Sequence, residues 1–441
     1  MCIRDSFYQG FQAVQGQPPF CEKVLKHNFK VILYEYLHNA RVSKCAMVTE
    51  SQGAAPLSAA PALQPKENKT MITIDGKYTE ARVFTDELED LARTQIRDVC
   101  NHPAFEGSRV RIMPDVHAGA GCVIGFTAEL KTDKVIPNLI GVDIGCGVLT
   151  ARLAGLPDFS RFDERLRERV PFGWNTRSAV HQALLDDPEL DDEISRICVD
   201  VLRTEKDRHR RSVGSLGGGN HFIEIAQGTE DAFLCIHSGS RNFGLKIAER
   251  YQKIAVATCP DAYLKERKKG LCYLQGEDTL NYMRDMKVAQ RFAALNRRVM
   301  LHELLDDAAD LEIFDTVHNY IAEDNVIRKG AVRAGLGEKL IVPLNMRDGS
   351  VICIGRGNEE FNSSSPHGAG RSMSRKKAKA NLSLEEFEAS MQGIFSTCVS
   401  RATLDEAPMA YKDGESVLGN IHETAEIVER IRPVYNFKAP E

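Results

Sequence analysis

The chain has 441 residues, of which 43% are hydrophobic, so it can form one large domain or two to three average ones. Its formal net charge of -5 excludes a protein that binds nucleic acid through bulk positive charge, and any basic surface must be local. The 12 cysteines form no CxxC pair, and neither a secretory signal nor an apolar run of membrane-spanning length is recognisable. These features predict a cytoplasmic protein with reduced thiols and no membrane partner.

Residues 1–70 differ in composition from the rest of the chain. Residues 47–70 are rich in Ala, Pro, Ser and Gln, which is typical of a disordered segment or a linker. The opening "MCIRDS" resembles an in-frame translation of a sequencing-library transposon end. We therefore expect residues 1–70 to be either a disordered extension or a non-biological upstream translation, and residues 71–441 to form the catalytic domain.

The first part of this domain predicts one helix followed by strands. Residues 87–103 place apolar side chains on one helical face, and Pro103 follows its end. Residues 123–130 alternate apolar and small or polar side chains, which indicates a half-buried strand. The predicted strands are residues 109–114, which we expect Pro114 to stop, residues 123–130 and residues 148–153.

The remainder of the chain alternates between helices and short strands without a regular βαβ rhythm. We find no internal repeat, so the pattern predicts an α+β fold: a single large domain with mixed sheets, surrounding helices and an active site at strand ends. The predicted helices are residues 191–208, 243–258, 281–307, 382–395 and 420–431, and the predicted strands are residues 222–225, 232–237, 340–345 and 351–355.

Short polar motifs at the predicted strand ends carry metal-ligand residue types. In "GVDIGCGV", Asp143 and Cys146 are three residues apart on a glycine-rich turn, so a carboxylate and a thiolate can reach one divalent ion. A thiolate ligand selects against magnesium. Taken alone, Cys146 is better explained as a small buried residue. "MPDVHAGAG" offers Asp115 and His117 on an expected turn after a strand.

Three histidines share a second pattern. His221, His237 and His318 each follow a predicted strand and border Gly, Asn or Ser. A lone histidine at a strand end is usually structural, but the recurrence indicates metal coordination. One cysteine, one aspartate and three histidines are too many ligands for one closed tetrahedral zinc site. They suit a binuclear site with a bridging thiolate or carboxylate, which can orient a phosphate and activate a nucleophile.

The loop "FNSSSPHGAGRSMSR" surrounds His367 with serines, glycines and an arginine. Gly368 and Gly370 allow a ligand to approach the backbone closely, and serine hydroxyls suit phosphate oxygens. Guanidinium groups match phosphate oxygens bidentately, so Arg371 and the Arg241 of "HSGSR" are candidate phosphate clamps. The alternative is a glycine- and serine-rich surface loop with an incidental histidine.

The motifs "MPDVHAG", "GVDIGCGV", "GGGNHF", "HSGSR", "VHN" and "SPHGAGR" occur in this order, and in this respect the chain resembles the RtcB RNA ligases from about Met71 to its C-terminal region. "DEAPMAYKDGESV", residues 405–417, resembles the C-terminal segment of the family, and the length resembles its shorter bacterial branch. Six motifs in order are far more specific than any one of them.

The resemblance implies a GTP-dependent ligase with two Mn²⁺ ions. It would join an RNA 3′-phosphate or 2′,3′-cyclic phosphate end to a 5′-hydroxyl end, through a guanylylated histidine and an RNA 3′ end activated by guanylate. RNA repair and tRNA splicing are both compatible roles, and dependence on an accessory activating protein stays open.

The resemblance also implies a role for each matching residue. The metal ligands would be Asp143, Cys146, His221, His237 and His318, with Cys146 bridging the ions. His367 would be the nucleophile, and Asp115 would handle the RNA end near the metals. Arg241 is expected to bind phosphate on the chemistry of its guanidinium group alone. The guanylate contacts that the resemblance implies are Asn220, Glu224 and Lys412. The chemistry of the loop around His367 adds Ser363, Ser364, Ser365, Gly368, Gly370 and Arg371 as expected contacts.

Two other functions remain as alternatives. The same binuclear site could serve a phosphodiesterase or phosphatase that acts on RNA ends without GTP, although such an enzyme needs no guanylate pocket around His367 and Lys412. A non-catalytic RNA-binding protein is the second alternative. It predicts losses among the ligand positions, whereas every expected ligand type is present.

Overall fold

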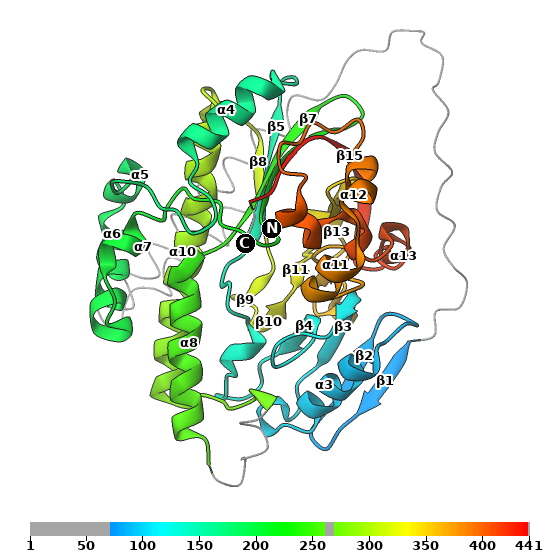
Figure 1. Cartoon of the computed structure of the whole chain (residues 1–441). Coiled ribbons are helices and arrows are strands. Elements are labelled where there is room, and N and C mark those ends of the chain that lie inside the picture. The colour runs from blue at the N-terminus through cyan, green and yellow to red at the C-terminus, as the bar shows by residue number, and fades with distance from the viewer. Residues whose placement is uncertain (1–70, 261–268, 440–441) are drawn as a thin grey trace, which may run out of the picture. The chain divides into compact units, whose positions relative to one another are not determined.

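The computed structural model describes residues 71–260 and 269–439, so the expected extension at residues 1–70 lies outside the described residues. Within this range the chain forms three sheets with helices packed around them (Figure 1), which confirms the α+β class with mixed sheets. None of the described helices is both long and apolar enough to cross a membrane.

The first sheet has six strands in the order β1-β2-β3-β4-β10-β9. It is mixed, because β2 and β3 are parallel and the other neighbours are antiparallel. Its strands are β1 (Ile72–Asp75), β2 (Glu80–Val83), β3 (Val110–His117), β4 (Ile124–Glu129), β9 (Asn319–Ile321) and β10 (Val326–Lys329).

Three expectations for this sheet were wrong. Strand β3 does not stop at Pro114, because its pairing with β4 is irregular between Ile112 and His117, and a proline is tolerated where the ladder needs no N–H donor. Asp115 therefore lies inside the strand rather than on a turn after it. Strand β4 is buried on both faces along its central four residues rather than half-buried.

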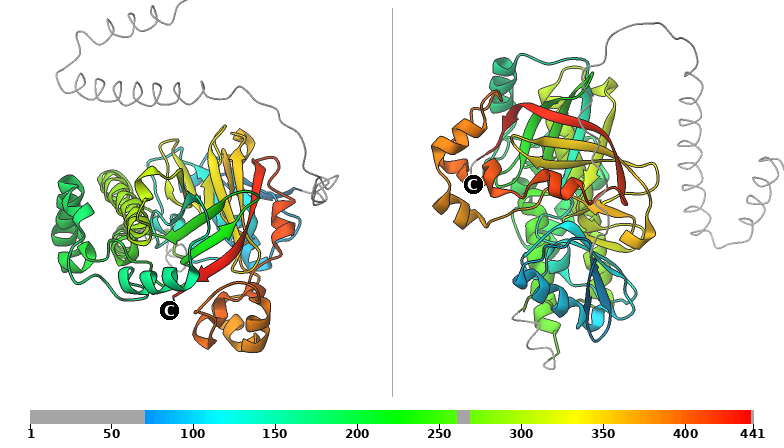
Figure 2. Two further views of the ribbon diagram at one scale, coloured as in Figure 1. Left: turned by 90° about the horizontal axis from the view of Figure 1, so that it is seen from above. Right: turned by 90° about the vertical axis from the view of Figure 1, so that its right-hand side faces the viewer.

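The second sheet has seven antiparallel strands in the order β12-β13-β15-β6-β7-β5-β8. Figure 2 shows its C-terminal strand, in red, running beside the green strands. Its strands are β5 (Gly147–Leu153), β6 (Phe222–Gln227), β7 (Ala232–Ser238), β8 (Ile313–Val317), β12 (Lys339–Asn345), β13 (Gly349–Gly355) and β15 (Ala425–Phe437). The third sheet pairs β11 (Ala331–Arg333) with β14 (Ser364–Pro366).

Strand β15 replaces the helix expected over residues 420–431. Its "AEIVERI" segment fits a helical spacing of apolar residues and a strand alternation equally well. The β-branched side chains at Ile427, Val428 and Ile431 favour a strand. Pairing with β13 and with β6 then supplies hydrogen-bond partners for the backbone on both sides.

Helices α8 (Arg241–Thr258) and α10 (Glu277–Leu304) lie side by side, and α10 also packs against β5 and β7 (Figure 1). The helix expected over residues 191–208 is divided into α6 (Pro188–Arg196), a π-helix (Ile197–Leu202) that continues it directly, and α7 (Lys206–Arg210). Arg203, with a left-handed φ of 53°, ends the π-helix and separates it from α7.

The shorter helices complete the description. They are α3 (Asp90–Cys100), α4 (Phe159–Arg169), α5 (Gln182–Leu185), α11 (Arg375–Asn381), α12 (Leu384–Ser390) and α13 (Gly414–Leu418). Single 3₁₀ segments span Pro103–Phe105, Pro137–Leu139, Ala308–Asp310, Glu359–Phe361, Arg401–Glu406 and Pro408–Ala410. The helix expected over residues 87–103 is confirmed as α3, and that expected over residues 382–395 ends earlier, as α12.

Candidate active site

Strand register brings the cysteine and the three expected histidines together. Cys146 precedes Gly147, which pairs with Ser238 on β7 and with Val317 on β8. His221 precedes Phe222, which pairs with His237. The expectation that each of these histidines follows a strand was therefore wrong for His221. In an antiparallel sheet the first residues of β5 and β6 lie beside the last residues of β7 and β8. Residues that precede β5 and β6 therefore meet residues at the ends of β7 and β8.

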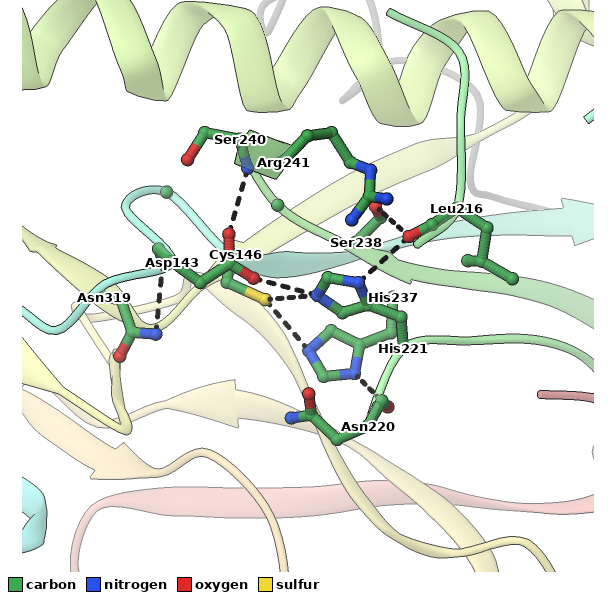
Figure 3. A network of polar contacts seen from close by, with 12 residues as sticks. Asp143, Cys146, Leu216, Asn220, His221, His237, Ser238, Ser240, Arg241 and Asn319 are labelled. Carbon is green, nitrogen blue, oxygen red and sulfur yellow. Dashed lines mark hydrogen bonds and ion pairs between the residues drawn. The ribbon is translucent and has the colours of Figure 1, made fainter. Parts of the chain in front are cut away.

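The gathered side chains form two overlapping groups of potential metal ligands. The Cys–His–His group contains Cys146, His237 and His318, and the Asp–Cys–His group contains Asp143, Cys146 and His221. Within each group the ligand atoms lie within 4.8 Å of one another. The Cys146 sulfur is 3.4 Å from Nε2 of His221 and 3.3 Å from Nε2 of His237 (Figure 3). Cys146 therefore belongs to both groups.

Two of these imidazoles are oriented by backbone carbonyls. Nδ1 of His221 lies 2.9 Å from the carbonyl oxygen of Leu216, and Nδ1 of His237 lies 3.2 Å from that of Asn220 (Figure 3). A carbonyl can only accept, so Nδ1 carries a proton in both rings, which leaves Nε2 as the atom that can bind a metal when the ring is neutral. This is the usual outer contact of a metal-binding histidine, and it aims both Nε2 atoms at Cys146.

Burial controls the protonation of the cluster. Desolvation lowers the pKa of His237 and of His318 well below the ordinary value, so both imidazoles are neutral near pH 7. Burial alone would raise the pKa of the Asp143 carboxyl, but the hydrogen bond and charge of His221 lower it to about 2. Burial and the neighbouring Asp143 raise the pKa of Cys146. A bound cation would reverse that effect, so this donor set fits soft or borderline divalent ions.

Two glycines make room for the charged side chains of the site. A Cβ atom at Gly239 would overlap the Asp143 carboxylate, and one at Gly217 would overlap the Arg241 guanidinium. This gives a physical reason for glycine in "HSGSR" and in "GGGNHF", where the sequence showed only a pattern.

Helix α10 holds the loops of the cluster together. The amide nitrogen of Asn296 donates to the carbonyls of Ser215 and Gly239, both at 3.1 Å. The fully buried Arg297 donates to the carbonyl of Gly145 at 2.9 Å and to that of Ser238 at 2.7 Å. These two residues were not identified from the sequence, because two polar residues within a helical pattern are usually solvent-exposed.

His367 forms a hydrogen-bonded pair with a buried carboxylate. Its Nδ1 lies 2.6 Å from Oδ2 of Asp115, which is fully buried in β3. The backbone N–H of His367 donates to the same oxygen at 3.3 Å. An ionised carboxylate can only accept, so the pair fixes the proton on Nδ1 and leaves Nε2 available for reaction. The His367 ring is 5.0 Å from the His318 ring, between centroids, so the nucleophile candidate adjoins the cluster.

A cavity of about 260 Å³, here called the His367 cavity, opens beside this pair. Three buried side-chain atoms in its wall have no hydrogen-bond partner: Oε1 of Glu224, Oγ of Ser350 and Oδ1 of Asn436. Desolvation raises the pKa of Glu224 to about 8, so its carboxyl is largely protonated at pH 7 and can donate a hydrogen bond. Unpartnered buried donors and acceptors fit a polar ligand such as a purine.

Some of the other expected nucleotide contacts line the His367 cavity and others do not. Asn220, Gly368, Gly370 and Arg371 line the His367 cavity. The nitrogens of Arg371, however, all donate to protein oxygens, on Met373, Asp405 and Glu406. The Lys412 ammonium donates to the carbonyl of Val116 at 2.6 Å, and Lys412 is not part of the cavity wall.

The three serines before His367 do not line the cavity either. The hydroxyl of Ser364 accepts a hydrogen bond from Arg328 and donates one to the carbonyl of Asn362. The hydroxyl of Ser365 is hydrogen-bonded to that of Thr424. Nucleotide binding by Ser363, Ser364 and Ser365 stays a prediction, and the hydroxyls of Ser364 and Ser365 already have partners within the protein.

A family model described as "tRNA-splicing ligase RtcB" matches residues 95–439. The chain belongs to the RtcB family. The RNA-splicing ligase RtcB of Escherichia coli (strain K12) is 31% identical over 387 residues, which cover 78% of this chain and 93% of that protein. The tRNA-splicing ligases RtcB of Thermococcus kodakarensis and Archaeoglobus fulgidus are 27% and 25% identical, and each alignment covers 84% of this chain and 95% of the relative.

The matched RtcB region contains both ligand groups and the His367–Asp115 pair. It also contains a positively charged side chain, that of Lys438, which no sequence motif indicated. Lys438 lines the His367 cavity, and its ammonium donates to Glu406 at 2.7 Å and to the carbonyl of Asn220 at 3.3 Å. It directly follows β15, so the mistaken helix over residues 420–431 also concealed this residue. A lysine after an alternating strand pattern is the signal that could have found it.

Proposed function

We propose that this RtcB family member is an RNA ligase that joins 3′-phosphate or 2′,3′-cyclic phosphate ends to 5′-hydroxyl ends, using GTP and two Mn²⁺ ions. The family assignment and the names of the relatives support the RNA-ligase class. The observation that carries the mechanism is the pairing of His367 with Asp115 beside a polar cavity and two ligand groups. Residues 71–441 would form the catalytic domain, and the location would be cytoplasmic.

The two ligand groups would hold the two ions, and Cys146 belongs to both groups. When bound, the ions would neutralise phosphate charge and align the reacting oxygens. The protein supplies Nε2 of His221 and His237 in the tautomer that a metal requires, because the backbone carbonyls hold Nδ1. Manganese and zinc both accept this donor set, and the choice of manganese follows the family resemblance.

His367 would carry the covalent step. Nε2 forms a bond to the α-phosphorus of GTP, and the bond to the pyrophosphate leaving group breaks. Asp115 keeps the Nδ1 proton in place and stabilises the positive charge that develops on the ring. The guanylate then passes to the RNA 3′-phosphate, and the 5′-hydroxyl of the second end displaces GMP. A cyclic phosphate end must first be opened by water.

The His367 cavity would bind the guanine nucleotide. Glu224 and Asn436 offer a neutral carboxyl and an amide side by side, since Nδ2 of Asn436 donates to Oε2 of Glu224 at 2.7 Å. Their remaining oxygens are buried without hydrogen-bond partners, and both residues line the cavity. A phosphodiesterase that works without GTP needs no pocket for a guanine nucleotide beside the histidine, so the ligase is the function that the geometry supports best.

The test is guanylylation of the full chain. The protein is incubated with α-labelled GTP and manganese in the absence of RNA and then separated on a denaturing gel. We expect an acid-labile, base-stable label that is absent from His367→Ala and present in His422→Ala, a matched change at a more exposed histidine. Label that persists in His367→Ala refutes the nucleophile, and no label on metal-loaded protein favours the phosphodiesterase.

A further inference from the structure

A second and larger cavity, of about 520 Å³, reaches the ligand groups at Asp143 rather than at His367. Its wall includes Arg241 and Arg208, and we call it the Trp174 cavity after the side chain considered below. It shares no lining residue with the His367 cavity. A nucleotide bound beside His367 therefore leaves the Trp174 cavity available for another ligand.

Trp174 is the chain's single tryptophan, and 76% of its surface is exposed. The turn that carries it is fixed on both sides. The N–H of Gly173 donates to the carbonyl of Gly217 at 3.0 Å, and that of Asn175 donates to Phe172 at 3.3 Å. An exposed indole on a fixed backbone loses little conformational freedom when a flat ligand stacks on it.

Arg241 connects this turn to the ligand groups. Its Nη2 donates to the carbonyl of Gly173 at 2.9 Å, and its Nε donates to Ser215 at 3.2 Å. Arg241 is the first residue of α8 and has a φ of 56°, a conformation that non-glycine residues rarely adopt. Such strain persists where the surroundings enforce it, and it is common at functional sites. The result is a guanidinium held in the wall that also contains Asp143.

We infer that Trp174 is a stacking platform for the 3′-terminal nucleobase of the RNA, with the terminal phosphate of that nucleotide between Arg241 and the Asp143 side of the ligand groups. This inference rests on the proposed function, because it requires a phosphate-ended RNA. The arrangement separates the two substrates, with guanylate on one side of the cluster and RNA on the other. Aromatic stacking tolerates every base, so the site selects a 3′-phosphate and not a sequence.

Intrinsic fluorescence tests the inference directly, because a single tryptophan reports on this position alone. The full chain with manganese is titrated with a triadenylate that ends in a 3′-phosphate. Two comparison probes are the same oligonucleotide with a 3′-hydroxyl and one that has an abasic 3′-terminal nucleotide bearing the 3′-phosphate. We expect saturable quenching by the first probe, weaker binding of the second, and binding without quenching for the third.

Variants separate stacking from folding. With an RNA labelled at its 5′ end, fluorescence anisotropy should show that Trp174→Ala weakens binding by about 5- to 150-fold, the range for loss of one base–aromatic stack. Trp174→Phe should restore most of the affinity. Leu280→Ala, at a position 71% exposed on α10, is the matched control and should bind as the parent chain does. Equal melting temperatures exclude unfolding as the cause.

The outcomes are distinguishable. RNA binding without any change in Trp174 fluorescence overturns the stacking and leaves the proposed ligase intact. Absence of RNA binding also overturns the inference, and guanylylation of His367 in the same sample then decides whether the proposed function falls with it.

Discussion

The hydrogen bond between His367 and Asp115 determines which nitrogen of the imidazole can react. We expect Asp115→Asn to slow guanylylation by about 10²- to 10⁴-fold, because an amide can donate to Nδ1 and thereby favour the tautomer with the proton on Nε2. The rate of label transfer from GTP, measured with metal content unchanged, tests this expectation.

The control for this variant is Asp163→Asn, which also alters a buried aspartate with several hydrogen-bond partners, among them Tyr435 at 2.8 Å. It should lower stability without a comparable loss of guanylylation rate. Equal losses of guanylylation rate in Asp115→Asn and Asp163→Asn would mean that Asp115 affects the reaction only through the stability of the fold.

Glu224 makes the stability of the protein depend on pH. Burial raises its pKa from an ordinary value of 4.5 to about 8, so between these values the folded chain holds a proton that the unfolded chain has lost. Stability therefore falls as pH rises through this range. Glu224→Gln removes this dependence, and we expect the parent chain to lose up to about 5 kcal/mol relative to the variant between pH 4.5 and 8.

Chemical denaturation of both proteins across this range, without GTP or metal, gives the measurement. Glu385→Gln, at an exposed position on α12, controls for the loss of one carboxylate and should run parallel to the parent chain. If the free energy of unfolding of Glu224→Gln changes with pH as that of the parent chain does, the pKa of Glu224 lies near its ordinary value.

At the scale of elements, the candidate site depends on one helix that contributes no ligand. Arg297 of α10 pairs with Asp315 at 2.6 Å and also donates to the carbonyls of Gly145 and Ser238, next to two of the ligand loops. Replacing it leaves a carboxylate and two buried carbonyls without partners.

We expect Arg297→Met to lower the free energy of unfolding by about 3 to 5 kcal/mol. It should also lower the bound metal per chain, because the Cys146 and His237 loops lose their common anchor. Denaturation and elemental analysis measure the two effects. Arg298→Met, at the neighbouring exposed position, should change neither, and full metal content in Arg297→Met would contradict the anchoring role.

Strand β15 illustrates where local patterns fail at this scale. Its backbone is held as a strand by pairing with β13 and β6 on either side, and every paired residue of those strands is at least 70 residues away in sequence. The ambiguous spacing of Ala425, Ile427 and Ile431 is decided by these partners. The same misreading hid Lys438, so an error about one element became an omission from the site.

At the scale of the whole molecule, every described residue assigned to the candidate site lies between Asp115 and Lys438. We therefore expect a chain that begins at Met71 to guanylylate His367 as the full chain does. Its melting temperature should rise when GTP and manganese are added together. At a GTP concentration 100 times the dissociation constant for GTP, binding raises the free energy of unfolding by about 2.7 kcal/mol. Loss of labelling or of the shift on truncation would assign residues 1–70 a role in the catalytic unit.

The sequence by itself determined the α+β class, most of the helices and strands, and the residue types of the cluster, because these follow from local periodicity and from motifs whose glycines and ligands are close in the chain. Tertiary structure alone decided which residues meet. Strand register joins Cys146 to His237 and His221, and β3 delivers Asp115 to His367 from 252 residues away. It also turned Ser364 and Ser365 toward other partners and brought Lys438 into the His367 cavity. The physical reason is that hydrogen bonds and burial across a sheet depend on pairing partners that no local window contains.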